Sequence, residues 1–76
     1  MEKVLEILKG IRPDIDFEKE TKLIDDKILD SFDIISIVSE FNDQFNIAID
    51  VEDLEPDNFN TVSAMWKLIT DKQSNG

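Results

Sequence analysis

Ser31 is the side chain whose neighbours most suggest chemistry, because it stands between Asp30 and Phe32 where a helical pattern begins. The spacing makes Asp30 the helix cap, Ser31 the first helical residue and Asp33 part of an acid-rich first turn that suits the helix dipole. A serine at the start of a helix can itself be a simple cap. Its hydroxyl can equally be a point at which another group is attached. Both interpretations of Ser31 stay open from this segment alone.

Catalysis by the chain itself is not expected from the residue types present. The chain contains neither cysteine nor histidine, so it has no thiolate nucleophile and no imidazole base to activate a hydroxyl. No glycine-rich phosphate loop is present, and the many acids show no spacing that singles out a catalytic pair. The sequence therefore predicts a protein that is not an enzyme and has no catalytic residues.

A metal site is also not expected. Zinc and copper prefer sulfur and imidazole ligands, which this chain cannot supply. Residues 14–25 place acids at positions 1, 3, 5 and 12 of a possible calcium loop. That segment has Lys19 where such a loop needs glycine and Asp25 where it needs glutamate. The sequence therefore predicts no bound metal.

The charge of the chain is strongly negative and unevenly distributed. Eighteen acidic and eight basic residues give a net charge of −10, and residues 28–66 hold nine acids and no base. Such a surface repels phosphate backbones, so nucleic-acid binding is not expected. It attracts basic protein surfaces and speeds encounters with them. The acids either face protein partners or only keep a small domain soluble.

The apolar pattern first predicts a short helix and then a long loop. Val4, Leu5, Leu8 and Ile11 follow a helical spacing, which Gly10 and Pro13 should stop. Residues 12–30 are mixed, and a loop of this length must be held down by its own apolar side chains. Those side chains are Ile15, Phe17, Leu23, Ile24, Ile28 and Leu29.

The second half of the chain predicts two more long helices. One starts near Asp30 or Ser31 and runs to about Phe45, and the last begins after Asn60 or Thr61. Between them Asp50 caps a single turn at residues 51–54, which Pro56 closes. The core stripe of the last helix is Val62, Met65, Trp66 and Ile69.

Together these elements predict an all-α fold, a small four-helix bundle of three main helices plus one short helix with a long first loop. We expect one domain over residues 1–76, of which residues 71–76 form a frayed tail. No apolar run is long enough to span a membrane, and the acidic N-terminal stretch is unlike a signal peptide. The chain is therefore expected to be a soluble, cytoplasmic monomer.

The middle helix has two apolar faces. On a helical wheel its core stripe consists of Ile34, Val38, Phe41 and Phe45, flanked by Ile37. Phe32 falls opposite this stripe with Ser36 and Asp43, while Ile35 and Ser39 lie between the two faces. An exposed phenylalanine beside Ile35 and rimmed by acids predicts a docking patch for a partner.

Residues 28–35, Ile-Leu-Asp-Ser-Phe-Asp-Ile-Ile, resemble the Asp-Ser-Leu signature of acyl carrier and peptidyl carrier proteins, with Phe32 in place of the usual leucine. The resemblance covers nearly the whole chain. It includes the first helix, the long loop, the segment Glu-Phe-Asn-Asp-Gln-Phe-Asn-Ile at 40–47, an acidic short helix and the segment at 58–62 that opens the last helix.

The resemblance implies that Ser31 carries 4′-phosphopantetheine, which a separate phosphopantetheinyl transferase moves from coenzyme A. The thiol of that arm would hold an acyl or aminoacyl group as a thioester, which fits a chain without cysteine. Asp30 would help the transferase engage. An activating ligase that loads the cargo and a downstream transferase would be the other partners. We expect the partner surface to consist of Phe32, Asp33, Ile35, Ser39, Asp43, Glu52 and Asp53.

Three departures from the fatty-acid carriers weigh against a housekeeping role. These are Phe32, a less acidic middle helix, and a segment between Ile49 and Val62 that is longer than usual. They resemble stand-alone carriers of specialised pathways, including D-alanyl carriers. The alternative of a different class is a non-covalent acidic interaction module that binds basic protein surfaces and never accepts an arm.

Overall fold

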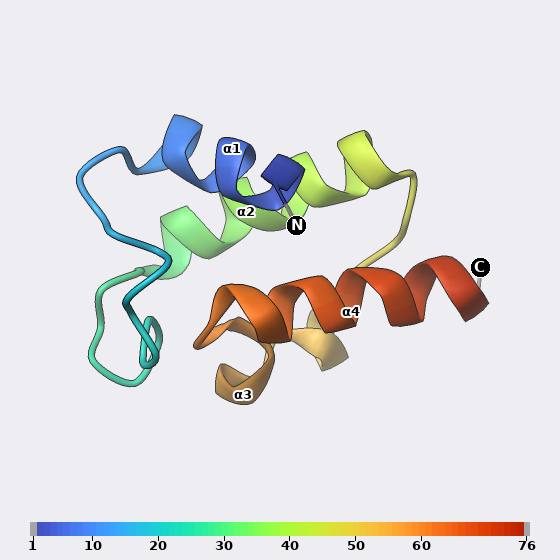
Figure 1. Cartoon of the computed structure of the whole chain (residues 1–76). Helices are drawn as coiled ribbons and strands as arrows, with labels where there is room; N and C mark the ends of the chain where they lie inside the picture. Colours follow the sequence, from blue (N-terminus) through green and yellow to red (C-terminus); the bar gives the residue numbers. More distant parts are fainter. Residues whose placement is uncertain (1, 76) are drawn as a thin grey trace.

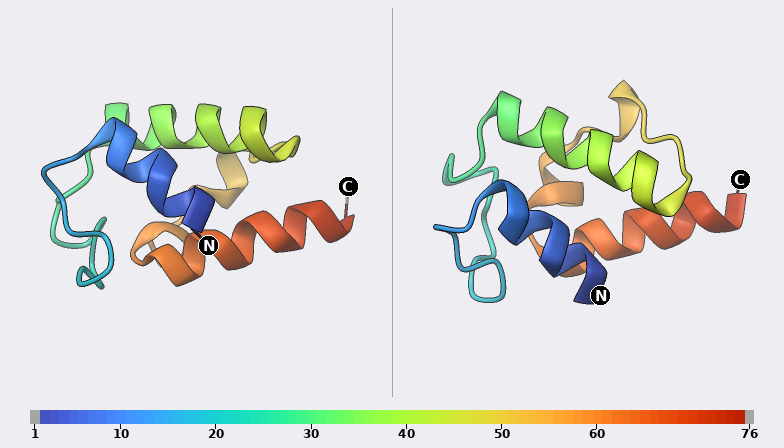
Figure 2. Two further views of the ribbon diagram at one scale, coloured as in Figure 1. Left: turned by 45° about the horizontal axis from the view of Figure 1, so that its top comes forward. Right: turned by 90° about the horizontal axis from the view of Figure 1, so that it is seen from above.

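The computed structural model describes residues 2–75 and is helical, without a strand among those residues. Its elements in chain order are α1 (Glu2–Ile11), α2 (Ser31–Phe45), the 3₁₀ turn η1 (Val51–Asp53), α3 (Pro56–Phe59) and α4 (Val62–Asn75). Helices α1 and α2 lie side by side, and α4 packs across the other side of both (Figures 1 and 2). The predicted small all-α helical bundle is confirmed.

One apolar core joins the three long helices and the first loop. Phe17 from the loop, Phe41 from α2 and Met65 from α4 are almost completely shielded from solvent. Val4 and Leu8 bring the same face of α1 against them, as the helical spacing predicted. Burying each side chain of this size contributes about 1.5–3 kcal/mol before the cost of chain ordering is counted, so this single cluster is what holds the domain together.

The buried line of α2 differs from the predicted stripe. Ile37 and Phe41 are completely buried, whereas Ile34, Val38 and Phe45 are only partly covered. The reason is that α2 contacts both α1 and α4, so its most buried line is the one that faces the junction of the two neighbours. Ile37, predicted as a flank, therefore lies at the centre of the core face.

The long loop between α1 and α2 covers one end of the bundle (Figure 1). Its predicted anchors are confirmed: Ile15, Phe17, Leu23 and Leu29 are buried, and Ile24 and Ile28 are partly buried. The buried side chain of Asn60, which lies between α3 and α4, holds this loop in place by hydrogen bonds. Its Oδ1 accepts the backbone N–H groups of Ile24 and Asp25 at 3.0 and 3.1 Å, and its Nδ2 donates to a carboxylate oxygen of Asp25 at 3.2 Å.

Three boundaries differ from those predicted. Helix α1 continues through Gly10 to Ile11, because a lone glycine costs only about 1 kcal/mol inside a helix. Pro56 opens α3 instead of only closing the preceding turn, as proline favours the first helical position. The last helix extends through Asn75, so residues 71–75 are helical where a frayed tail was predicted, and residue 76 lies outside the described residues. Lys72 holds that last part by an ion pair with Asp53 at 2.7 Å.

Candidate functional site

The start of α2 is fixed by a reciprocal pair of hydrogen bonds. The backbone N–H of Asp33 donates to Oδ1 of Asp30 at 2.9 Å, and the backbone N–H of Asp30 donates to Oδ2 of Asp33 at 3.3 Å. Asp30 has extended backbone angles, as expected for a cap, and Ser31 is the first residue of the helix. The capping function thus belongs to Asp30, and Ser31 is exposed to solvent beside it.

The location of Ser31 suits a covalently attached anion. The amides of the first helical turn point towards the helix start, where they and the dipole favour negative charge. The Asp33 amide is used by the cap and the Ile34 amide bonds the carbonyl of Asp30, which leaves the amides of Ser31 and Phe32 for an anion. The exposed carboxylate of Asp30 has the opposite effect, since it repels a phosphate beside it.

Arg12 joins the loop to this cap. Its guanidinium donates to Asp33 and to both carboxylate oxygens of Asp14, the latter at 3.0 and 2.9 Å. The hydrogen bonds that Arg12 donates to Asp14 and Asp33 hold its pKa well above the ordinary value, and the bond from Arg12 lowers the pKa of Asp14. The side chain of Asp33 is only 13% exposed, so it serves the fold more than the surface.

Two large apolar side chains lie exposed immediately after Ser31. Phe32 is 81% exposed and Ile35 is 64% exposed, so the second apolar face predicted for α2 is present. The 3₁₀ turn and the residue that follows it contribute two more exposed apolar side chains, Val51 and Leu54, which the sequence pattern did not single out. This turn lies on the side of α2 away from α1 (Figure 2).

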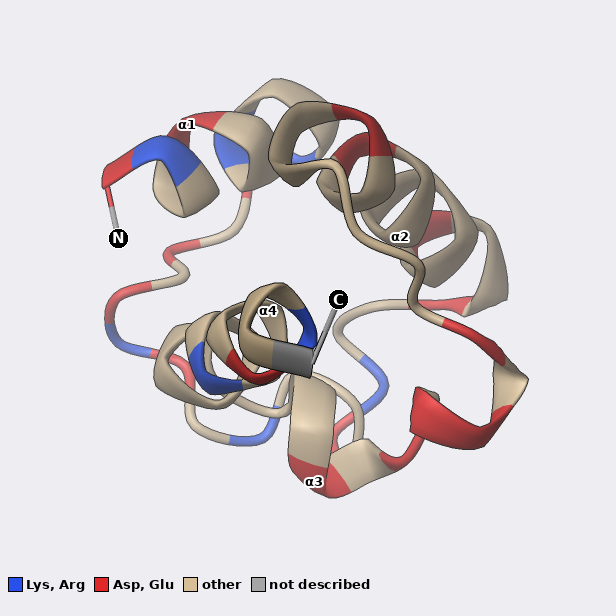
Figure 3. Cartoon of the chain, turned by 90° about the vertical axis from the view of Figure 1, so that its right-hand side faces the viewer, with Lys and Arg blue, Asp and Glu red and all other residues tan. Residues whose placement is uncertain are grey.

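The basic residues lie on α1, the first loop and α4 together with further acids, whereas α2, η1 and α3 form an acidic side that carries no base (Figure 3). Asp43 and Glu52 are exposed members of this acidic side. Asp53 differs from them, because its side chain is 20% exposed and its carboxylate binds Lys72. The hydrogen bond from Lys72, followed by the backbone N–H of Asp50, lowers the pKa of Asp53.

The seven residues expected to face partners therefore fall into two groups. The carboxylates of Asp33 and Asp53 are occupied by Arg12 and Lys72 and are mostly covered. The other five are exposed on the surface of the domain, and they are Phe32, Ile35, Ser39, Asp43 and Glu52.

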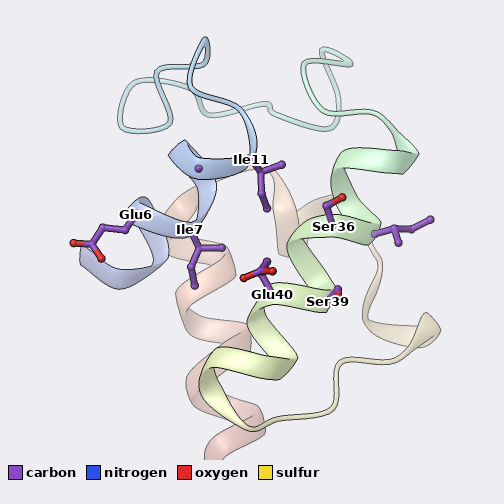
Figure 4. Close-up of a pocket in the computed structure, with 8 residues that line it drawn as sticks. Glu6, Ile7, Ile11, Ser36, Ser39 and Glu40 are labelled. Carbon is purple, nitrogen blue, oxygen red and sulfur yellow. The ribbon is translucent and has the colours of Figure 1, made fainter.

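A groove of about 780 Å³ runs between α1 and α2. Figure 4 shows Ile7 and Ile11 of α1 on one side and Ser36, Ser39 and Glu40 of α2 on the other. Ile35 also lines it, so Ile35 and Ser39 open towards this groove. The sequence did not predict the groove, because its two walls come from separate helices.

A family model described as a phosphopantetheine attachment site matches residues 2–69. The match runs from α1 to the middle of α4 and includes the whole region around Ser31. The comparisons with curated proteins and with solved structures found no match. Among residues 2–75, no helix combines the length and apolar character that crossing a bilayer requires.

Proposed function

The chain belongs to the family of phosphopantetheine attachment domains, and we propose that Ser31 is the residue that carries the group. The family attaches 4′-phosphopantetheine covalently, and its domains act as carriers. The observation that supports Ser31 is its place as the exposed first residue of α2, directly after the capping residue Asp30. That position combines an accessible hydroxyl with backbone amides that favour a phosphate.

The attachment needs an accessible nucleophile on this chain and a base on the transferase. The Ser31 oxygen forms a bond to the phosphorus atom that bears pantetheine, and the pyrophosphate bond of coenzyme A breaks. Adenosine 3′,5′-bisphosphate leaves, and the hydroxyl proton passes to a base of the transferase. Asp30 directly precedes Ser31 and is proposed to help the transferase engage, in addition to its role as helix cap.

The thiol of the attached group supplies the thioester that the chain itself cannot form, since the chain has no cysteine. We propose an acyl or aminoacyl cargo, loaded by an activating ligase and passed to a downstream transferase, with no catalysis by the carrier. Three exposed side chains support this role. Phe32 is an apolar anchor for a partner, and Asp43 and Glu52 are acids on the surface of the same domain. The partners of this family are phosphopantetheinyl transferases and synthetic enzymes. A basic docking surface on such an enzyme is attracted to the acidic surface of this domain.

Intact mass spectrometry tests the proposal. The purified chain is incubated with coenzyme A, magnesium and a broad-specificity phosphopantetheinyl transferase, and one pantetheinyl phosphate should be gained. Ser31→Ala should gain nothing, whereas the control Ser36→Ala, which removes another exposed α2 hydroxyl, should be modified normally. No adduct with several transferases would favour the acidic interaction module, and an adduct retained by Ser31→Ala would place the group elsewhere.

The single domain over residues 1–76, the monomeric state and the cytoplasmic location stay predictions. One continuous core among the described residues supports the single domain. Gel filtration with light scattering, at concentrations above and below those in the cell, measures the monomeric state directly.

A further inference from the structure

The groove between α1 and α2 begins close to the proposed attachment point. Ile35, the first α2 residue in its lining, lies one helical turn after Ser31, and residues four apart share a helix face. Glu40, the last, is nine residues after Ser31, or about 13.5 Å along the helix axis. The groove thus runs along α2 away from Ser31.

A phosphopantetheine arm is long enough to lie in this groove. About fourteen bonds separate the serine oxygen from the arm's sulfur. At the reach of an extended chain, about 3.3–3.6 Å for every three bonds, they span about 16 Å. An arm on Ser31 therefore covers the rise of about 12 Å to Ser39, and the atoms of a cargo beyond the sulfur extend the reach towards Glu40.

The lining of the groove suits a polar arm whose cargo carries a positive charge. Ile7 and Ile11 provide an apolar wall, and Ser36 and Ser39 provide hydroxyls that can bond amide groups. The charged lining residues are Glu6 and Glu40, with no lysine or arginine among those that line the groove. Glu40 extends over the middle of the groove, whereas Glu6 points away from α2 (Figure 4).

Gly10 keeps part of the α1 wall open. A Cβ atom added at this position would meet nothing within 4 Å. The glycine lies inside α1, where alanine would be more favourable by about 1 kcal/mol. A larger residue at position 10 can therefore occupy the groove without a steric conflict with the fold.

We propose that this groove is the resting site of the loaded arm, and that it selects a cargo bearing an ammonium group, an aminoacyl group, with Glu40 as the counter-charge. The inference rests on the proposed function, since the arm must first be attached at Ser31. A neutral acyl group of the same size gains no ion pair in the groove, so its arm spends a smaller share of the time there.

The experiment compares two cargoes of nearly equal size. Synthetic coenzyme A analogues, in which an amide replaces the thioester, place alanyl-pantetheine or propionyl-pantetheine on the ¹⁵N-labelled chain. Relative to the unloaded arm, the alanyl form should shift the amide signals of Ile7, Ile11, Ser39 and Glu40. The propionyl form, which lacks the ion pair, should shift these four signals about two- to fivefold less. Equal shifts with both cargoes would overturn the selection of an ammonium group.

Matched variants separate the groove from the general acidity of the domain. Glu40→Gln should reduce the alanyl-specific shifts by about two- to fivefold, as expected for an exposed ion pair. Glu55→Gln makes the same change in charge at an exposed residue outside the lining and should leave the shifts unchanged. Gly10→Leu should abolish them by filling the groove. Equal losses in Glu40→Gln and Glu55→Gln would overturn the proposal.

Intact mass, measured on every sample first, keeps the two hypotheses apart. A wild-type chain that gains no group contradicts the attachment at Ser31. A fully loaded chain whose alanyl-dependent shifts stay within the residues next to Ser31 contradicts the groove and leaves the attachment intact.

Discussion

The guanidinium of Arg12 binds the carboxylate of Asp33, 21 residues further along the chain. The same carboxylate accepts the backbone N–H of Asp30, so one side chain links the end of α1, the first loop and the cap of α2. Arg12 also binds Asp14 within the loop. The position of Ser31 therefore depends on a residue that is distant in sequence.

Replacement of Arg12 by glutamine should loosen this link while the core stays packed. Asp33 would lose its partner at a mostly covered site, so backbone hydrogen exchange at Asp33 and over residues 12–16 should become several-fold faster. Hydrogen exchange followed by NMR measures this directly. The control Lys19→Gln removes an exposed lysine whose Nζ lies 3.9 Å from Oδ2 of Asp16. The exchange rates of this variant should match those of the wild type. Unchanged exchange at Asp33 in Arg12→Gln would contradict the link.

Truncation of two phenylalanines on α2 should change the stability of the domain by very different amounts. Phe41 is completely buried and packs edge-on against Phe45, with ring centroids 6.0 Å apart, so Phe41→Ala should cost about 3–5 kcal/mol through lost burial and a cavity. Phe32 is exposed, and Phe32→Ala should change stability by less than about 1 kcal/mol. Circular dichroism melts measure both.

The same pair of variants separates packing from recognition. Phe32→Ala should be modified clearly more slowly by the transferase in single-turnover assays, since a docking surface loses its apolar anchor. A domain of this size has only about 5 kcal/mol of stability in total, so Phe41→Leu serves as the milder core variant. If Phe32→Ala unfolds the protein or leaves each transfer rate unchanged, Phe32 is ordinary packing.

Asn60 should contribute more to stability than its polar side chain suggests. Asn60→Ala leaves the backbone N–H groups of Ile24 and Asp25 without their acceptor. Both bonds are only partly buried, so the loss should be about 1 kcal/mol, the lower end of the cost of an unsatisfied buried donor. Urea denaturation measures this loss. Gln44→Ala, on the exposed side of α2, is the control and should stay within about 0.5 kcal/mol of the wild type. Equal stability of the two variants would show that water replaces the amide.

The ion pair between Asp53 and Lys72 should give stability over a defined pH range. The pKa of Asp53 is lowered, so its contribution is complete above the ordinary aspartate value of about 3.9 and is lost as pH falls through the lower folded value. Lys72 has a raised pKa, chiefly from the bond to Asp53. Its contribution is therefore complete below the ordinary lysine value of about 10.4 and is lost as pH rises through the raised value.

Carboxyl NMR titration of Asp53 checks this assignment. Lys72→Met should move the Asp53 midpoint upwards, towards the ordinary aspartate value. Lys67→Met removes an exposed lysine from the same helix and should leave the midpoint where it is. A midpoint that is indifferent to Lys72 would mean that the N–H of Asp50, which also bonds Asp53 at 3.1 Å, causes the shift instead.

Local patterns predicted those features of the fold that depend on a few adjacent residues. The apolar spacing of Val4 and Leu8 indicated α1, and Asp30 before Ser31 indicated the start of α2. The helix at Pro56 was missed because proline both ends and begins helices, and the local sequence does not distinguish the two. The role of Asn60 was missed for another reason, since its partners lie more than thirty residues away.

The candidate site could be predicted from the sequence to the same extent as the fold. The exposed Phe32 and Ile35 followed from helical periodicity, which assigns one face to the core and leaves the other to solvent. The commitment of Asp33 and Asp53 to internal ion pairs did not follow, because their partners Arg12 and Lys72 come from outside the acidic segment. A charge pattern reports the sign of a surface, and only the packed chain shows which charges are compensated.

The hydrogen-bonded cap at the start of α2 has a consequence for how often a cargo meets an enzyme. With the backbone on either side of Ser31 held by Asp30 and Asp33, an arm attached there pivots about one fixed point. Its free end stays within about 16 Å of that point. A docked enzyme therefore meets the cargo at an effective concentration in the millimolar range, however dilute the carrier is.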